Sequence, residues 1–544
     1  MRQELGVVGA AVIAVALAAW PGCSGDDTPA APTTSAVGGA AQGGAAGQGG
    51  SGAGGAGQPG GSGGGGSEEC SSHAIAVEVP PYDSGNAEHF LIQTVEDWDH
   101  IDDPDKRVFY VAAHDDYGTV TITASGTATE PRYLALYDDT GQHPAQLPTE
   151  QQANVRLIFD GVSHWVVHRL SGIGYSDQYA LRIEPVSHHI VVDRMNFDDF
   201  RGAVLVLSGP DPASPTHDIT IQHNRMDSMS MTGIDGDAVA VMLSGDPWDE
   251  FRRVENVHIL DNEIRNCNDG VMLIRHPELA GGHEVDYPGT IIDCNHIYVD
   301  SEVYTDGAGN QDPDGLWAFT ENAIDLKGGS EDPAKPVVVS NNFMWGYRHT
   351  DTNGGGSGSW GTAFGGHYDV KNLEVFGNVI FDSNRGLTFG DPHGLPYSVE
   401  NLYAHDNIFY DIGFSTSGDT EYCHYFYESR NVRYEHNTVV GVEAHSRWFS
   451  HGDSETGLEV RCNAIVDSAA MTGTRAADTI VEDNYLYDTD RQQDGDGQLY
   501  GSAAEAGLED LVFTTDRYTN QPRTITLPNV VTTAASPHAD WCTR

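Results

Sequence analysis

The stretch "LEVFGNVI", residues 373–380, decides the fold of this 544-residue chain. Leu373 and Val375 alternate with other residues, which is typical of a β-strand, and the following Gly-Asn pair is typical of a sharp turn. The frame apolar-x-apolar-x-x-Asn-x-apolar recurs in eight other segments. They are "ITIQHNRM" (219–226), "VHILDNEI" (257–264), "TIIDCNHI" (290–297), "VVVSNNFM" (337–344), "LYAHDNIF" (402–409), "VRYEHNTV" (432–439), "LEVRCNAI" (458–465) and "TIVEDNYL" (479–486).

One asparagine per segment recurs at spacings that vary from 21 to 47 residues. Short strands, no helical stripe and a variable repeat length favour a parallel β-helix, in which each repeat is one coil and the insertions are loops. We expect the asparagines to stack at one corner and to hydrogen-bond from coil to coil. A β-sandwich or propeller, the alternatives, would not require an asparagine at one position of every repeat. The nine are Asn224, Asn262, Asn295, Asn342, Asn378, Asn407, Asn437, Asn463 and Asn484.

The N-terminal region predicts export. Residues 1–23 combine Arg2 with the apolar run "VVGAAVIAVALAAW", which is short for a membrane span, and end in "WPGC". This ending resembles the lipobox of bacterial lipoproteins, so Cys23 is expected to be lipidated and to hold the protein on a bacterial outer membrane. An ordinary cleaved signal of a secreted protein is the alternative. We expect a disordered Gly-rich linker over 24–68, the β-helix over 69–500 and its C-terminal cap over 501–544.

The charge balance restricts the partners. With 80 acidic and 28 basic side chains the formal net charge is −52, which excludes general nucleic-acid binding. Acid clusters instead suit Ca²⁺, which prefers oxygen ligands. Nothing after the signal is apolar enough to cross a membrane, so membrane contact is expected through the lipid only. The six later cysteines have no zinc-type spacing, and their pairing stays open: Cys70, Cys267, Cys294, Cys423, Cys462 and Cys542.

The ladder segments, together with "VFYVAAHDDYGTVTITASGT" and "VSHWVVHRL", resemble the right-handed parallel β-helix proteins of the pectate-lyase-like superfamily. The resemblance covers roughly residues 85 to 500. It implies a right-handed all-β solenoid, a monomer and a polysaccharide as partner. The fold hosts lyases, hydrolases, epimerases and adhesins, so it does not define the substrate.

A third strand is expected in each coil, after the asparagine turn. The segments 202–209, 238–245, 270–277, 322–329, 361–368, 386–393, 422–429 and 446–453 supply these strands. Aligning their apolar residues places Ile274, Leu326, Phe389 and Phe426 in one core stack. The next position then points outward and carries Arg275, Lys327, His367, Asp391, Tyr427, and Ser450 or His451, whereas earlier coils carry Leu207 and Leu243 there. A titratable stripe that begins partway along a solenoid is typical of a carbohydrate site.

Lys327 is one of only four lysines in the chain, and it follows the alternating stretch Ala323–Leu326. It lies two residues from Asp325 on the same face. An arginine beside it and partial burial would both lower the pKa of Lys327, and a neutral amine can act as a general base. A solvated lysine that merely pairs with Asp325 is the alternative.

The segment "NQDPDGLWAFTE", residues 310–321, fits a calcium-loop template. Asn310, Asp312, Asp314 and Glu321 would be the ligands and Gly315 the turn. The loop directly precedes the Lys327 strand, so a calcium ion would lie beside the stripe.

The segment "DPHG", residues 391–394, resembles a signature of mannuronan C5-epimerases, which are also parallel β-helices. Asp391 and His393 match the residues that handle the C5 proton in that family. Gly394 stands where the family has an acidic residue, and Thr388 where it has a tyrosine.

These residues predict a lyase that cleaves a uronate-containing polysaccharide by β-elimination. Arg275 and Ca²⁺ would neutralise the carboxylate, Lys327 or His393 would remove the C5 proton, and Tyr427 or His367 would protonate the leaving oxygen. An inverting hydrolase that uses Asp325 and Asp391 is the first alternative. A C5-epimerase and a non-catalytic glycan-binding adhesin are the others.

Overall fold

The computed structural model describes residues 73–114, 116–137, 152–175, 178–209, 213–227, 238–244, 252–274, 285–299, 321–347, 361–390, 396–413, 422–442, 449–451, 455–466, 468, 478–482, 484–487 and 497–499. All of them belong to one compact unit, built from residues 63–354 and 359–544. The predicted signal, linker and C-terminal cap lie outside the described residues. Within the described part of the chain, no helix has the length and apolarity needed to span a membrane.

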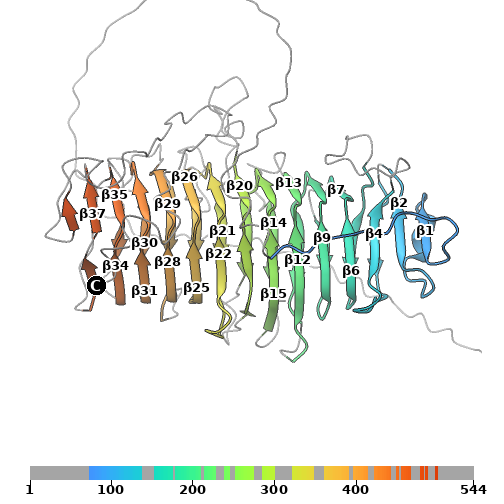
Figure 1. Cartoon of the computed structure of the whole chain (residues 1–544), viewed down its shortest axis with the longest axis horizontal. Helices are drawn as coiled ribbons and strands as arrows, with labels where there is room; N and C mark the ends of the chain where they lie inside the picture. Colours follow the sequence, from blue (N-terminus) through green and yellow to red (C-terminus); the bar gives the residue numbers. More distant parts are fainter. Residues whose placement is uncertain are drawn as a thin grey trace, which may run out of the picture. The chain divides into compact units, whose positions relative to one another are not determined.

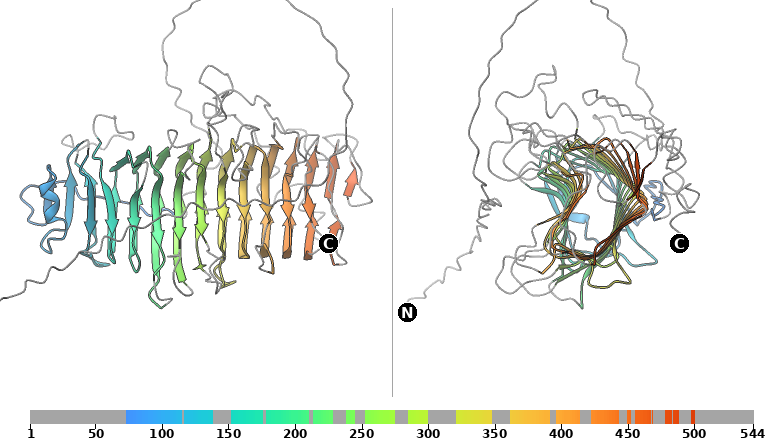
Figure 2. Two further views of the ribbon diagram at one scale, coloured as in Figure 1. Left: turned by 180° about the vertical axis from the view of Figure 1, so that it is seen from behind. Right: turned by 90° about the vertical axis from the view of Figure 1, so that its left-hand side faces the viewer.

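The described residues form three parallel sheets that the chain visits in turn, so that one coil contributes one strand to each sheet (Figures 1 and 2). We number the sheets 1, 2 and 3 in the order in which a coil passes through them. The end-on view in Figure 2 shows the three sheets around a common interior. Apart from the 3₁₀ helix η1 (Glu96–His100), the described elements are all strands. The predicted parallel β-helix is confirmed.

Sheet 1 comprises β1 (His89–Ile92), β2 (Val108–Val111), β4 (Arg132–Leu136), β6 (Ser163–His168), β9 (His188–Asp193), β12 (Thr216–Gln222), β15 (Arg252–Leu260), β19 (Ile291–Asp293), β22 (Val337–Ser340), β25 (Val370–Phe376), β28 (Val399–His405), β31 (Ser429–Glu435), β34 (Thr456–Arg461) and β36 (Ile480–Glu482), with β18 (Val285–Asp286) beside β15. Sheet 2 comprises β7 (Ser171–Ile173), β10 (Asn196–Asp198), β13 (Arg225–Asp227), β16 (Glu263–Arg265), β20 (His296–Tyr298), β23 (Phe343–Trp345), β26 (Val379–Ser383), β29 (Ile408–Ile412), β32 (Thr438–Val440), β35 (Ala464–Val466), β37 (Asn484–Tyr487) and β38 (Gly497–Leu499). Sheet 3 comprises β3 (Thr119–Ile122), β5 (Arg156–Phe159), β8 (Tyr179–Ile183), β11 (Gly202–Leu207), β14 (Val239–Ser244), β17 (Asp269–Ile274), β21 (Asn322–Leu326), β24 (Thr362–Gly366), β27 (Arg385–Phe389), β30 (His424–Phe426) and β33 (Ser450–His451).

The nine predicted asparagines form a continuous ladder at the turn between sheets 1 and 2. The Nδ2 of each donates to the Oδ1 of the next asparagine over 2.9–3.2 Å. The backbone N–H of each donates to the same Oδ1. All nine side chains are buried, so the amide satisfies the polar backbone that the turn would otherwise leave unpaired.

A second ladder, which the sequence analysis did not predict, lies on the outside of sheet 1. Asn372, Asn401 and Asn431 take left-handed backbone angles at equivalent positions of successive coils. The Nδ2 of Asn401 donates to Asn372 over 2.9 Å, and that of Asn431 donates to Asn401 over 3.0 Å. Asparagine tolerates positive φ better than most residues, which explains its recurrence at this bulge.

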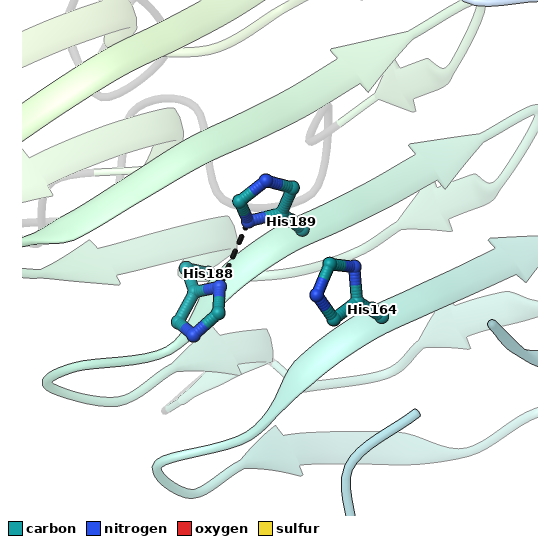
Figure 3. Close-up of side chains that lie close together, drawn as sticks. All are labelled: His164, His188 and His189. Carbon is teal, nitrogen blue, oxygen red and sulfur yellow. Dashed lines mark hydrogen bonds between the residues drawn. The ribbon is translucent and has the colours of Figure 1, made fainter. Parts of the chain in front are cut away.

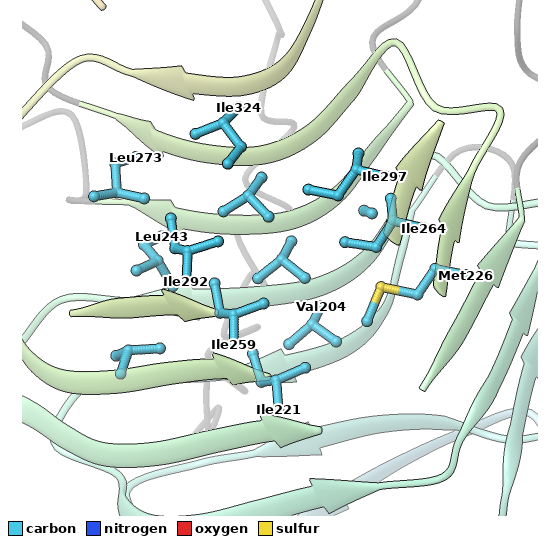
Figure 4. Packing of buried hydrophobic residues seen from close by; sticks show 14 of the residues in the cluster. Val204, Ile221, Met226, Leu243, Ile259, Ile264, Leu273, Ile292, Ile297 and Ile324 are labelled. Atoms are coloured by element: carbon cyan, nitrogen blue, oxygen red, sulfur yellow. The ribbon is translucent and has the colours of Figure 1, made fainter. Parts of the chain in front are cut away.

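The interior is filled by apolar side chains that stack from coil to coil. Figure 4 shows aliphatic rows such as Ile221, Ile259 and Ile292 from neighbouring strands of sheet 1. Aromatic rows continue the core in later coils, where the Phe389 and Phe426 rings stack 5.8 Å apart. Because every coil packs mainly on its two neighbours, the register of the strands fixes which side chains share a face.

Four cysteines lie among the described residues. Cys267 and Cys423 are buried free thiols, and burial raises the pKa of each. Cys294 and Cys462 are each disulfide-bonded.

Candidate functional site

The candidate site is the outer face of sheet 3 from β21 onward. All eight predicted third strands are present in sheet 3. In β21 the side chains of Ile324 and Leu326 belong to the core. Since side chains alternate along a strand, Asp325 and Lys327 share the opposite, outer face. Equivalent outer positions in the next coils are Gly365 and His367 in the β24 coil, Thr388 and Gly390 in the β27 coil, and Tyr425 and Tyr427 in the β30 coil.

The predicted register was wrong by one residue in the early coils. Leu273, not Ile274, pairs with Leu326 and lies in the core stack. Ile274 is therefore level with Lys327, and Arg275 is one residue further along. Leu243 likewise pairs with Leu273 and points into the core. Leu273 and Ile274 are adjacent apolar residues at the end of a strand, so the sequence does not show which of them points inward. The pairing of Leu273 with Leu326 shows that it is Leu273.

Lys327 and Asp325 form a close ion pair, with 2.8 Å between Nζ and Oδ2. The Asp325 side chain is fully buried, and that of Lys327 is 13% exposed. Burial acts to lower the pKa of Lys327, but Asp325, then Glu321 and Asp269, outweigh it and raise this pKa above its usual value. The predicted lowering of the Lys327 pKa was wrong, because the sequence alone did not reveal how many carboxylates surround the amine.

The carboxylate of Asp325 is only partly satisfied. Among the described residues, no donor to its Oδ1 is found, although the atom is buried. A buried carboxylate oxygen without a donor is costly unless a cation lies close by, and Lys327 supplies that cation. The pair therefore fixes the position of the Lys327 ammonium on the outer face of sheet 3, where the charge of Asp325 offsets that of Lys327.

His367 lies immediately after β24 and is half-buried. It follows Lys327 in the stack, because its backbone N–H donates to Leu326 as that of Lys327 does to Leu273. Its ring Nδ1 lies 3.0 Å from the carbonyl oxygen of Gly390, so the ring donates from Nδ1. The prediction that Lys327 and His367 are neighbours on one face is supported by this register.

A row of tyrosines ends the face, and the sequence analysis identified only one of its members. The ring of Tyr425 stacks on Tyr422 at 5.3 Å and on Tyr427 at 6.2 Å. Tyr427 is 37% exposed. Burial, together with the neighbouring tyrosines, raises the pKa of Tyr425 to about 12. The segment "EYCHYFYES" could have indicated this row, because its tyrosines lie beside the buried Cys423 and Phe426.

The outer face changes character along sheet 3. In β14 and β17 it presents Met242, Met272 and Ile274, which form an apolar cluster with Val239. From β21 onward the same columns carry Asp325, Lys327 and then histidine, threonine and tyrosine. The predicted polar stripe therefore begins at β21, one coil later than the sequence analysis placed it.

Several predicted site residues lie outside the described residues: Arg275, Asp391, His393, Asn310, Asp312, Asp314 and Cys23. Glu321 is described. It directly precedes β21, it is half-buried, and its charge contributes to the raised pKa of Lys327. The calcium loop and the Asp-Pro-His segment thus remain predictions.

No protein-family model matches the chain, and no curated protein matches it. An alginate lyase from Paenibacillus sp. str. FPU-7 is similar in structure, with 14% identity, a TM-score of 0.35 and coverage of 60% of this chain and 94% of that chain. The catalytic unit of an α-1,3-glucanase from Streptomyces thermodiastaticus has 10% identity, a TM-score of 0.33 and coverage of 73% and 65%. PfbA, a surface adhesin of Streptococcus pneumoniae, has 10% identity, a TM-score of 0.32 and coverage of 74% and 85%. These likenesses do not decide between a lyase, a hydrolase and an adhesin.

Proposed function

We propose that the protein is a secreted polysaccharide lyase that cleaves a uronate-containing glycan by β-elimination on the outer face of sheet 3. The observation that carries the proposal is the Lys327–Asp325 pair. It places a permanently charged ammonium beside His367 and in line with the exposed Tyr427. Elimination from a uronate requires a cation and groups able to move protons, and this face supplies His367 in the coil next to Lys327 and Tyr427 three coils away.

Lys327 is assigned a different role from the one that the sequence suggested. With a raised pKa it stays protonated at neutral pH and has no lone pair to remove a proton. It would instead bind the uronate carboxylate. Neutralising the charge of that carboxylate makes the C5 proton more acidic. Arg275 and a calcium ion in the 310–321 loop would assist in this charge neutralisation.

The proton transfers fall to the neighbouring groups. A base removes the proton from C5, the C4–C5 double bond forms, and the C4–O4 bond breaks. An acid then protonates the departing oxygen. His393 is the proposed base. His367, in the coil next to Lys327, is the first choice of acid, and Tyr427, three coils or roughly 14 Å along the stack, is the second. The spacing of neighbouring coils, about 4.8 Å, suits roughly one sugar unit per coil along this face.

A non-catalytic glycan-binding adhesin is the second candidate, and the tyrosine row favours it. Tyr422, Tyr425 and Tyr427 stack with nearly parallel rings along the face and offer aromatic surface on which sugar rings can pack. The hydrolase alternative needs two carboxylates at the bond. Asp325 is buried and bound to Lys327, which leaves it poorly suited to act as an acid or base.

Incubation with pectate, alginate and glycosaminoglycans, with and without chelator, tests the proposal. A lyase produces ultraviolet absorbance from the new C4–C5 double bond, together with shorter chains. Shorter chains without this absorbance would identify a hydrolase. Retention of an intact glycan without any product would identify the adhesin, and an altered C5 configuration without cleavage the epimerase.

The Tyr427→Phe variant is expected to lose turnover by roughly 10²-fold or more if its hydroxyl is the acid. The ring and its stacking on Tyr425 remain, so glycan affinity should change little. Tyr422→Phe is the matched control, because it removes a hydroxyl from the opposite end of the same stacked row. Equal turnover in both variants and the parent protein would assign the acid role to His367.

Calcium is expected to raise the melting temperature, because an ion that binds only the folded protein stabilises it by mass action. Thermal unfolding in excess Ca²⁺ and in chelator measures the shift. The Asp312→Asn/Asp314→Asn variant should abolish the shift without altering the melt in chelator. The same melting temperature in both buffers would remove calcium from the proposal.

The proposed location is the bacterial cell surface, through lipidation of Cys23, with a secreted form as the alternative. Metabolic labelling with a palmitate analogue would detect the lipid. The Cys23→Ala variant should then lose the label and appear in the medium.

A further inference from the structure

Four histidines and one aspartate gather on the outside of sheet 1, away from the face described above. They come from three successive strands: His164 from β6, His188 and His189 from β9, and His217 and Asp218 from β12. Figure 3 shows the His164, His188 and His189 rings turned toward one another. No role in the proposed glycan chemistry accounts for this cluster.

The local backbone explains why these side chains converge. His188 and His217 are paired in register, and their rings stack in parallel at 4.7 Å. His164, His189 and Asp218 occupy the bulge position beside them, where all three have positive φ. In later coils this bulge carries the asparagines of the outer ladder. Imidazoles therefore replace amides at a position where the fold itself requires only a residue that tolerates the left-handed conformation.

The nitrogen atoms lie at distances that suit a metal ion. One ring nitrogen from each of His164, His188 and His189 lies within 4.8 Å of the others, and the two Nδ1 atoms of His188 and His189 are 2.8 Å apart. Zn–N bonds of about 2.0 Å place two ligands of a tetrahedral ion roughly 3.3 Å apart. Side-chain adjustments of about 1 Å would therefore close the site.

The surroundings favour neutral, oriented ligands. Burial, and then His189, lowers the pKa of His164, and burial followed by the three neighbouring imidazoles lowers that of His188. Neutral imidazole is the form that binds metals. Asp218 accepts from Nδ1 of His217 over 2.7 Å and from Asn256 over 3.2 Å, and its Oδ2 lies 3.6 Å from Nε2 of His189. A small shift of the His189 ring would bring it to hydrogen-bond distance, where an outer carboxylate orients a metal-bound histidine.

We propose that His164, His188 and His189 bind a divalent transition-metal ion of the Zn²⁺ class, with Asp218 orienting His189. The ion would bridge the β6 and β9 coils, and three protein ligands would leave a fourth position for water or a ligand oxygen. The His189 side chain is 45% exposed, which gives the ion a route from solvent.

Calorimetric titration of the metal-free protein with Zn²⁺ tests this site, with Ca²⁺ as the comparison ion. We expect one Zn²⁺ per chain at the cluster. His189→Asn should weaken binding by at least ~100-fold, more than the loss of an outer-shell partner costs. The asparagine keeps the left-handed bulge, as Asn401 does in a later coil. The visible absorption of bound Co²⁺ reports the ligands independently of the heat.

The variants distinguish the ligands from their neighbours. His164→Asn should also abolish binding, whereas Asp218→Asn should weaken it only about 10–100-fold. His100→Asn, which changes an exposed histidine of η1, should bind like the parent protein. Circular dichroism melts confirm that each variant is folded. Equal Zn²⁺ affinity in His189→Asn and His100→Asn would overturn the proposal, as would full loss in Asp218→Asn with unchanged binding in His164→Asn.

Discussion

Replacing Lys327 by alanine is expected to destabilise the protein by about 3 kcal/mol and to abolish most of its turnover. The variant leaves the carboxylate of Asp325 buried, charged and without its cation. Removing one partner of a buried ion pair costs far more than the pair contributes, because the remaining charge is uncompensated. Removing an exposed strand lysine would instead change the free energy of unfolding by only about 0.5 kcal/mol. Urea unfolding measures the stability change, and product absorbance measures turnover.

The double variant Lys327→Ala/Asp325→Asn separates the two effects. It removes both charges, so most of the stability should return, whereas turnover should remain roughly 10²-fold or more below the parent because the carboxylate-binding cation is absent. Lys335→Ala is the matched control, since Lys335 pairs with Glu255 at the surface and its loss should change little. A single variant as stable as the parent would show that Asp325 tolerates isolation and would contradict the pair's structural role.

The Lys327→Arg variant distinguishes a role of Lys327 as a carboxylate-binding charge from a role as the general base. Arginine retains the positive charge but does not deprotonate in proteins. Substantial turnover in this variant supports carboxylate binding, and complete loss with intact stability would restore the general-base role. The raised pKa of Lys327 also predicts how stability depends on pH. The stability contributed by the protonated amine is fully present below the ordinary lysine pKa, and it is lost only as the pH rises through the raised pKa of the folded protein.

The fold could be predicted from sequence because its determinants are local and repeated. Each ladder segment carries its own strand alternation and its own corner asparagine, and nine copies agree. The outer ladder was missed because Asn372, Asn401 and Asn431 lie within strands, where nothing in the sequence marks the bulge. The left-handed backbone at these positions is visible only in the structure.

The site could be predicted only in part, for physical reasons that particular residues illustrate. The grouping of Lys327, His367 and Tyr427 follows from the strand frame and needed no coordinates. The pKa of Lys327 depends on Asp269 from the preceding coil and on Glu321, whose distances a sequence does not give. The histidine cluster escaped notice for the same reason, because "SHHI" at 187–190 acquires His164 and His217 only when three coils stack.

Replacing Asn407 by alanine is expected to destabilise the protein by roughly 3 kcal/mol, because buried groups lose their hydrogen-bond partners. The Oδ1 of Asn407 accepts from the Nδ2 of Asn378 over 2.9 Å and from its backbone N–H over 3.1 Å. Its Nδ2 donates to Asn437 and to the Val375 carbonyl. The variant leaves the backbone N–H of Asn378 buried and unpaired, at about 1–3 kcal/mol, whereas the Nδ2 of Asn378 keeps the Val339 and Phe376 carbonyls as acceptors.

The Asn401→Gly variant is the matched control for Asn407→Ala, because Asn401 lies in the same coil but belongs to the exposed outer ladder. Glycine accepts its left-handed backbone, and Gly457 already occupies the equivalent position of another coil. The loss of one part-buried and one exposed hydrogen bond should cost about 1 kcal/mol. Urea unfolding followed by far-ultraviolet circular dichroism compares the two midpoints. Equal shifts of the two midpoints would mean that an inner-ladder asparagine contributes no more stability than a surface amide. The asparagines of the inner ladder would then recur for a reason other than the pairing of buried backbone groups.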